Sequence, residues 1–285
     1  MDKKVRAYRP VVFLAIVLGF SFVFFITAAL VDAPLSRVFH YIGGVGPMVA
    51  ALILLFSLHS ADFRKNYFRR CIDFRAIKPW SYLIIIGVVV LYRFGGPILK
   101  GLVEFKPLVV SLDESIANQP INIIPILFFI IIFGPIPEEL GWRGYCQDSL
   151  AEKYGLLNSS MILGMIWSFW HLPLFFIEGS YQNTIPVGSI AFWVFILDLI
   201  PKAVIMGWIY YANNRSILSA ILFHFLINLF GEIFVIEPEG LLYQFAILLI
   251  IAVVFGMDLA SENNMGFVKN DDFSESNENN RNHQG

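Results

Sequence analysis

Long apolar runs, separated by short polar connections, repeat along most of the chain. A helix needs roughly 20 mostly apolar residues to cross a bilayer, and runs of about that length recur with few charges inside them. The pattern therefore predicts an all-α membrane protein whose spanning helices form a bundle. We expect about eight such helices, at 11–31, 41–60, 80–99, 121–141, 158–177, 188–211, 216–232 and 241–257.

Helix-breaking residues interrupt three of the expected spans. They are Gly43, Gly44, Gly46 and Pro47 in the second span, Gly134, Pro135 and Pro137 in the fourth, and Pro201 in the sixth. Broken backbone at membrane depth persists only where protein or water satisfies the freed polar groups. We therefore expect these breaks to face protein or a water-filled space.

The composition agrees with this interpretation. Of the 285 residues, 57% are hydrophobic and only 15% are charged, whereas soluble domains are closer to half apolar and a quarter charged. A lipid bilayer is therefore the expected surrounding, and the net charge of −2 predicts no nucleic-acid partner. The two cysteines, Cys71 and Cys146, form no CxxC pattern, so we expect neither a disulfide framework nor a zinc knuckle.

Basic residues predict the orientation, because cytoplasmic loops carry an excess of Lys and Arg. Four basic residues precede the first span, and six more lie in the connection 62–78. The connection 232–240 has three Glu and no Lys or Arg. We therefore expect a cell-membrane protein with both termini in the cytoplasm. The first run, 11–31, is about twice as long as the apolar core of a secretory signal, so we expect it to be retained.

The domain organisation is expected to be simple. Residues 1–258 are predicted to form a single polytopic membrane domain, and no internal repeat or Gly-rich phosphate loop is evident. The segment 259–285 is polar and poor in aromatic residues, which is typical of disordered tails.

Polar side chains inside the apolar runs need a reason, since each charge at membrane depth costs on the order of 2.5–3.5 kcal/mol on insertion scales. They are Glu138, Glu139, Arg143, His171, Asp198, Lys202, His224 and Asn228. Structural pairing is one explanation: Asp198 and Lys202 are four residues apart on one helix face and can form an ion pair. His224 and Asn228 can join helices by hydrogen bonds, and His171, among aromatic residues, can be a buried structural histidine.

Pairing explains the adjacent carboxylates only in part. Pro137 suits the first position of a helix, which places Glu138 and Glu139 in the first turn, where the helix dipole favours negative charge. Glu139 and Arg143 have i, i+4 spacing and can pair. Adjacent side chains on a helix point about 100° apart, so one Arg cannot easily serve both carboxylates. Glu138 is left without an obvious partner.

Together, the three segments supply the groups that water-activating chemistry needs. A carboxylate takes a proton from water, while imidazole and amide N–H groups stabilise the oxyanion that forms on the attacked carbonyl. The zinc motif HExxH and a GxSG-type serine turn are both missing, and only Asp198 among the aspartates lies well inside a span. Among the chemical designs of membrane proteases, the one that remains is a glutamate that acts as base with histidines around it.

At these residues the chain resembles the CAAX prenyl protease and bacteriocin-processing (Abi) family of intramembrane glutamic endopeptidases. Three motifs carry the resemblance, in the family's order: EExxxR at 138–143, an aromatic residue at Trp167 followed by His171, and HxxxN at 224–228. The family usually has Phe at the position of Trp167. Because one aromatic residue replaces another, we expect packing rather than chemistry to differ there.

The resemblance implies an eight-helix bundle with a water-filled cavity that opens to the cytoplasm. It implies that Glu138 and His171 activate water for peptide-bond hydrolysis, and that His224 and Asn228 form the oxyanion site. The substrate would be a peptide or a prenylated-protein C-terminus, and no cofactor would be required. Glu139 and Arg143 would orient the cluster. The candidate catalytic residues are therefore Glu138, Glu139, Arg143, His171, His224 and Asn228.

Two alternatives stay open at this point. Glu138, His171 and His224 could instead form a zinc set in a metal-dependent membrane protease. The protein could also be non-catalytic, acting in bacteriocin immunity by binding, or as a transporter with Asp198 and Lys202 as an ion relay.

Overall fold

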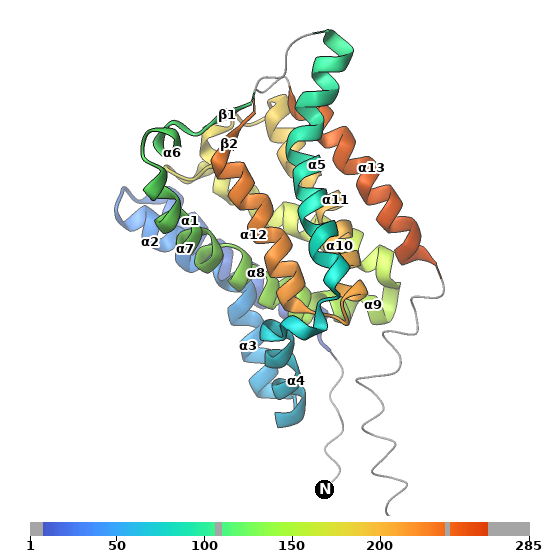
Figure 1. Ribbon diagram of the computed structural model, residues 1–285. Coiled ribbons are helices and arrows are strands. Elements are labelled where there is room, and N and C mark those ends of the chain that lie inside the picture. Colours follow the sequence, from blue (N-terminus) through green and yellow to red (C-terminus); the bar gives the residue numbers. More distant parts are fainter. Residues whose placement is uncertain (1–7, 106–109, 237–239, 262–285) are drawn as a thin grey trace, which may run out of the picture.

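The computed structural model describes residues 8–105, 110–236 and 240–261 (Figure 1). Within these residues the chain folds almost entirely into helices, which confirms the all-α prediction. Most of the predicted polar tail, 262–285, lies outside the described residues, as do three of the four basic residues that precede the first span.

The helices follow one another with short connections. The first five are α1 (Pro10–Leu30), α2 (Leu35–Gly44), α3 (Gly46–Leu58), α4 (Ala61–Ile72) and α5 (Pro79–Glu104). The next are α6 (Glu114–Asn118), α7 (Ile123–Phe133), α8 (Pro135–Gly141), a π-helical turn (Trp142–Gln147) and α9 (Asp148–Tyr154). The last are α10 (Leu156–His171), α11 (Ile190–Ala212), α12 (Ile217–Ile233) and α13 (Leu241–Ala260). Short 3₁₀ turns occur at Phe74–Ala76, Pro120–Asn122, Leu172–Phe176 and Gln182–Thr184. Two strands, β1 (Ser111–Leu112) and β2 (Phe234–Val235), pair antiparallel, with Ser111 opposite Val235 and Leu112 opposite Phe234.

All eight predicted apolar runs are helical, but eight spanning helices are not confirmed. By length and composition, the described residues contain six helices long and apolar enough to cross a membrane. The α2–α3 pair is bent by 44° and would make a seventh if it is one span. The remaining run forms α12, whose 17 residues make it shorter than a typical spanning helix.

Serine side chains set the beginnings of three helices. Ser60, Ser189 and Ser216 each accept a hydrogen bond from the backbone N–H three residues later, at the start of α4, α11 and α12. This arrangement satisfies one of the four N–H groups that a helix start leaves unpaired.

The predicted breaks divide into two kinds. The fourth span breaks at Gly134, whose φ of −120° and ψ of −92° end α7, because prolines at 135 and 137 lack the N–H groups that would continue the helix. Helix α8 restarts at Pro135 rather than at Pro137, so Glu138 is in its first turn and Glu139 follows. Pro201, by contrast, lies inside α11 without ending it, and the expected break there is wrong.

A close contact holds the fourth pass against the second. A Cβ atom at Gly141 of α8 would lie 2.4 Å from the Cβ of Pro47 in α3, so only glycine allows the two helices to approach in this way. This contact fixes the position of α8 and of the carboxylates that it carries.

Successive passes alternate in direction, which gives the bundle two distinct ends (Figure 1). One end carries the start of α1, helices α4 and α9 and the last turn of α13; we call it the terminal end. The other carries β1, β2, α6 and the connection 177–189 between α10 and α11; we call it the strand end.

A buried ionic cluster joins elements at the terminal end. The Asp148 carboxylate at the start of α9 accepts hydrogen bonds from the Tyr210 hydroxyl at 2.9 Å and from Arg70 of α4 at 3.4 Å. The Arg215 guanidinium, from the connection between α11 and α12, forms an ion pair with the same carboxylate. Because Asp148 is only 2% exposed, these partners supply what water would otherwise provide.

Candidate active site

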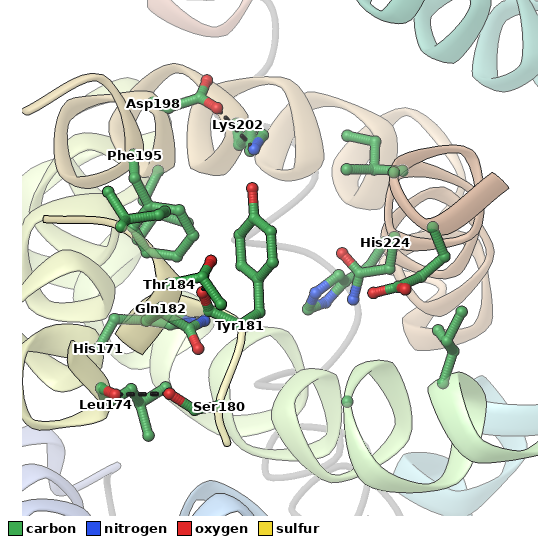
Figure 2. A pocket seen from close by; sticks show the side chains of 18 of the residues that line it. His171, Leu174, Ser180, Tyr181, Gln182, Thr184, Phe195, Asp198, Lys202 and His224 are labelled. Atoms are coloured by element: carbon green, nitrogen blue, oxygen red, sulfur yellow. Dashed lines mark hydrogen bonds and ion pairs between the residues drawn. The ribbon is translucent and has the colours of Figure 1, made fainter. Parts of the chain in front are cut away.

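A cavity of about 1030 Å³ lies inside the bundle, and Figure 2 shows part of it from close by. Its walls come mainly from α2, α5, α7, α8, α10, α11, α12 and α13 and from the connection 179–186. Four candidate residues line it, namely Glu138, His171, His224 and Asn228. The structure therefore brings the three sequence motifs to one cavity.

The two adjacent carboxylates of α8 lie in different surroundings. Glu138 lines the cavity and is 7% exposed, whereas Glu139 is fully buried behind the wall. The expectation that the two side chains point in different directions is therefore confirmed. Their divergence allows one carboxylate to reach the cavity while the other is held by protein groups.

Glu139 is held by two cationic or potentially cationic side chains. Nη1 of Arg143 donates to both carboxylate oxygens, at 3.1 and 2.9 Å, so the predicted i, i+4 pair is present. Nδ1 of His224 lies 2.8 Å from Oε1 of the same carboxylate. His224 is thus tied to Glu139 rather than to Asn228, and it links α12 to α8.

Glu138 has a partner that the sequence interpretation missed. The indole Nε1–H of Trp167 donates to its Oε2 at 2.6 Å. Phenylalanine has no such donor, so the expectation that Trp167 changes packing alone is wrong. The signal was available in the sequence, because a buried indole N–H usually finds a hydrogen-bond acceptor.

The Trp167 ring also contacts other members of the cluster. Its centroid lies 5.6 Å from that of His171 and 5.3 Å from that of His224, both in edge-on arrangements. The Arg143 guanidinium lies 5.2 Å from the ring centroid, where a cation–π interaction compensates for its burial. One side chain of α10 therefore touches residues from all three motifs.

The geometry defines the tautomer of His171. Its Nδ1 lies 2.8 Å from the backbone oxygen of Trp167. A carbonyl oxygen can only accept, so Nδ1 carries the hydrogen and Nε2 of the neutral ring has a lone pair. His171 therefore presents a proton acceptor to the cavity that it lines.

Asn228 follows His224 by one helical turn and also lines the cavity. Its Nδ2 atom would lie 3.5 Å from a Cβ placed on Gly134. The carboxamide therefore sits against the break between α7 and α8. This break brings the amide of α12 close to the helix that carries Glu138.

A second cluster of polar side chains lies in the part of the cavity wall that α5 and α11 form. Lys202 Nζ lies 2.7 Å from Oδ2 of Asp198, which confirms the predicted ion pair. The Tyr92 hydroxyl donates to the same oxygen at 2.7 Å, and the Lys202 ammonium lies 5.0 Å from the Tyr92 ring centroid. All three residues line the cavity, and Figure 2 shows Tyr181 pointing into it from the connection near this wall. Tyr92 was missed because an uncharged tyrosine gives no signal in an aromatic-rich chain.

The proposed zinc set does not form a ligand cluster. Among the residues described, no three His, Cys, Asp or Glu side chains are arranged so that they could hold a metal ion. Glu138, His171 and His224 line one cavity, but two of them direct a polar atom to Trp167, and His224 directs Nδ1 to Glu139.

Comparison with known proteins gives the family. Residues 120–230, which contain all three motifs, match a family model described as type II CAAX prenyl endopeptidase Rce1-like. The chain is also 32% identical over 220 residues to CAAX prenyl protease 2 of Methanococcus maripaludis, which covers 74% of this chain and 77% of that protein. With its long apolar helices, the protein is therefore a multi-pass membrane peptide hydrolase and belongs to the CAAX prenyl protease family.

Proposed function

We propose that this protein is an intramembrane endopeptidase that hydrolyses a peptide bond with a water molecule activated by Glu138. The observation that carries the proposal is the convergence of a carboxylate, two imidazoles and a carboxamide from three helices on one cavity. General-base catalysis and oxyanion binding need these groups within reach of one substrate carbonyl.

In this proposal Glu138 is the general base. Trp167 occupies its Oε2 and leaves Oε1 to accept a proton from water, while the Nε2 lone pair of His171 accepts the water's other hydrogen bond. The water oxygen bonds to the carbonyl carbon, and the C=O π electrons move to the carbonyl oxygen. The electron pair on that oxygen then re-forms the C=O bond as the C–N bond breaks, and the proton held by Glu138 passes to the departing amine nitrogen.

His224 and Asn228 are proposed to stabilise the negative oxygen. The Asn228 carboxamide supplies an N–H donor. His224 uses Nδ1–H toward Glu139, so its Nε2 donates only when the ring carries a second proton and forms an ion pair with that carboxylate. Glu139 and Arg143 are proposed to orient this imidazole rather than to touch the substrate.

The proposed substrate is a peptide or the C-terminal segment of a prenylated protein. The M. maripaludis relative is named as a CAAX prenyl protease, and the cavity combines the polar cluster with aromatic walls that include Tyr41, Phe129 and Phe133. Cleavage of matched peptides with and without a prenyl group decides between these two substrates.

The decisive experiment compares purified variants on a quenched fluorescent peptide. Glu138→Gln and His171→Ala are expected to abolish hydrolysis while the proteins insert and fold. Glu114→Gln, an exposed carboxylate in α6, is the matched control and should keep full activity. Full activity in Glu138→Gln would end the proposal.

No metal ion is required in this mechanism. We therefore expect activity to survive chelator treatment. Loss of activity that added zinc restores would instead favour the metal-dependent alternative.

A further inference from the structure

One charged pair in the cavity wall has no part in the proposed reaction. Asp198 and Lys202 of α11 form an ion pair, with 2.7 Å between Nζ and Oδ2, and both line the cavity. A buried ion pair is weak evidence for stability, because taking two charges out of water can cost more than their attraction returns. Ionisable side chains in spanning helices are expensive to insert and usually mark a functional site. A role in binding therefore explains this pair better than a role in stability.

Asp198 and Tyr92 hold the Lys202 ammonium in one position. The Tyr92 hydroxyl donates at 2.7 Å to the same Asp198 oxygen that pairs with Lys202, and the ammonium lies 5.0 Å from the Tyr92 ring centroid. An ammonium has three N–H donors, and among the described residues the pair with Asp198 is its only hydrogen-bonding contact. Because the Lys202 side chain is 14% exposed, a bound group can reach the remaining donors.

One face of α11 connects this ammonium to the catalytic cluster. Phe195, Asp198 and Lys202 have i, i+3, i+7 spacing, which places them on one side of the helix, and all three line the cavity. The Phe195 ring centroid lies 5.7 Å from that of His171. Figure 2 shows these three residues together with His171 and His224 around one pocket. A substrate whose scissile bond lies at His171 can therefore reach Lys202 with a neighbouring part of its chain.

The group that fits this ammonium is a carboxylate. Hydrogen bonds between Lys and an anionic oxygen are stronger than neutral ones, and a carboxylate that leaves water for a cavity needs such a partner. Among the described residues, Arg93 is the other Lys or Arg in the cavity lining. Its Nη2 already donates to the backbone oxygen of Gly231 at 3.2 Å. Lys202 is therefore the better candidate, and Arg93 serves as a comparison in the experiment.

We infer that Lys202 binds the free C-terminal carboxylate of the substrate. The substrate class is then a peptide segment that ends inside the cavity, recognised by the charge of its end. Asp198 and Tyr92 act as positioning residues, since they hold the ammonium and need not touch the peptide. This inference rests on the proposed function, because it assigns a substrate contact within the same cavity.

Binding of two matched peptides tests the inference without hydrolysis. The probe is a dye-labelled S-farnesyl-Cys-Val-Ile-Met peptide, which has the CAAX pattern, made once with a free C-terminal carboxylate and once with a carboxamide. Fluorescence anisotropy gives the Kd of each peptide for the Glu138→Gln protein in detergent. We expect the carboxylate form to bind about tenfold more tightly or better, as a hydrogen bond to a charged group allows. Equal Kd values, or no binding of either peptide, would overturn the inference.

Substitution of Lys202 in the same background identifies the residue responsible. In Lys202→Gln, the Kd of the carboxylate peptide should rise about tenfold or more, while that of the carboxamide peptide stays nearly unchanged. Lys202→Arg keeps a cation and should restore part of the preference. Lys153→Gln, at an exposed position of α9 outside the cavity lining, is the matched control and should keep the full preference. A preference that persists in Lys202→Gln, or that Arg93→Gln abolishes instead, overturns the inference.

A double variant covers the case in which Lys202→Gln does not fold. That substitution leaves the buried Asp198 carboxylate without its cation, which is destabilising. Combining it with Asp198→Asn removes both charges and avoids this penalty. The double variant should bind the two peptides equally, and a retained preference for the carboxylate form would contradict the assignment of Lys202.

Hydrolysis by the wild-type protein separates this inference from the proposed function. We expect kcat/KM to be about tenfold higher or more for the carboxylate peptide. If the protein binds the peptides with the expected preference but hydrolyses neither, the proposed function fails and the carboxylate site stands. If it hydrolyses both with equal kcat/KM, the proposed function stands and the carboxylate site fails.

Discussion

The indole N–H of Trp167 donates a hydrogen bond of 2.6 Å to the carboxylate of Glu138. The two residues belong to different passes of the bundle, α10 and α8. The same ring lies edge-on to His171 and to His224, so a single side chain contacts the proposed base and both imidazoles. Phenylalanine has no N–H donor and could not make this hydrogen bond.

The first prediction follows from this contact. Trp167→Phe should lower kcat roughly 10- to 100-fold with little change in KM, because a hydrogen bond to a charged group contributes about 1.5–3 kcal/mol. The measurement is steady-state kinetics in detergent, together with the thermal unfolding midpoint of each variant.

Trp142→Phe provides the matched control for that experiment. Trp142 is fully buried, and its Nε1 has no hydrogen-bond partner among the described residues. The two substitutions remove the same atoms, so a pure packing effect would lower both activities alike. Equal losses of activity in the two variants would show that Trp167 does not position Glu138 through its hydrogen bond.

The second prediction concerns the oxyanion site. Asn228→Ala should lower kcat by about 10²–10³, as loss of one oxyanion donor usually does, and should leave KM and the unfolding midpoint nearly unchanged. Asn118→Ala, at the exposed end of α6, is the control. An Asn228→Ala enzyme with normal kcat would show that the carboxamide does not bind the oxyanion.

The third prediction separates orientation from chemistry at Glu139. Glu139→Gln leaves the buried Arg143 charge without its carboxylate, and breaking a buried ion pair costs about 3–5 kcal/mol. We expect a lower unfolding midpoint together with a lower rate. A rate loss without a stability loss would indicate that Glu139 takes part in the reaction itself.

The fourth prediction concerns the ionic cluster at the terminal end. Asp148→Asn should destabilise the protein by about 3–5 kcal/mol, because Arg70 and Arg215 would lose their shared buried anion. The activity of the folded fraction should not change, since Asp148 is not part of the cavity wall. Asp258 accepts a hydrogen bond from Trp208 at an exposed position. Asp258→Asn should therefore lower the free energy of unfolding much less.

The helices were predictable because apolar runs of spanning length have few alternatives in a bilayer. The way in which prolines act was less predictable. Pro135 and Pro137 follow a glycine and end a helix, whereas Pro201 is accommodated inside α11. Periodicity and breaker residues alone do not distinguish these cases, because neighbouring helices decide whether a freed carbonyl is satisfied.

The candidate site was predictable as a set of residue types but not as a set of contacts. The i, i+4 pair of Glu139 with Arg143 follows from helix geometry and is present. The bond between His224 and Glu139 spans 85 positions, and no local pattern encodes it. The role of Trp167 was missed because it was treated as an aromatic ring rather than as a hydrogen-bond donor.

The shared carboxylate of Glu139 makes the energetic effects of its two partners inseparable. Arg143 and His224 both bind Oε1 of Glu139, so replacing either one changes the strength with which the other is held. Single substitutions will therefore overstate each partner's own contribution. A double-mutant cycle should give a combined loss smaller than the sum of the two single losses, and the difference measures the coupling that this one side chain creates between two passes of the bundle.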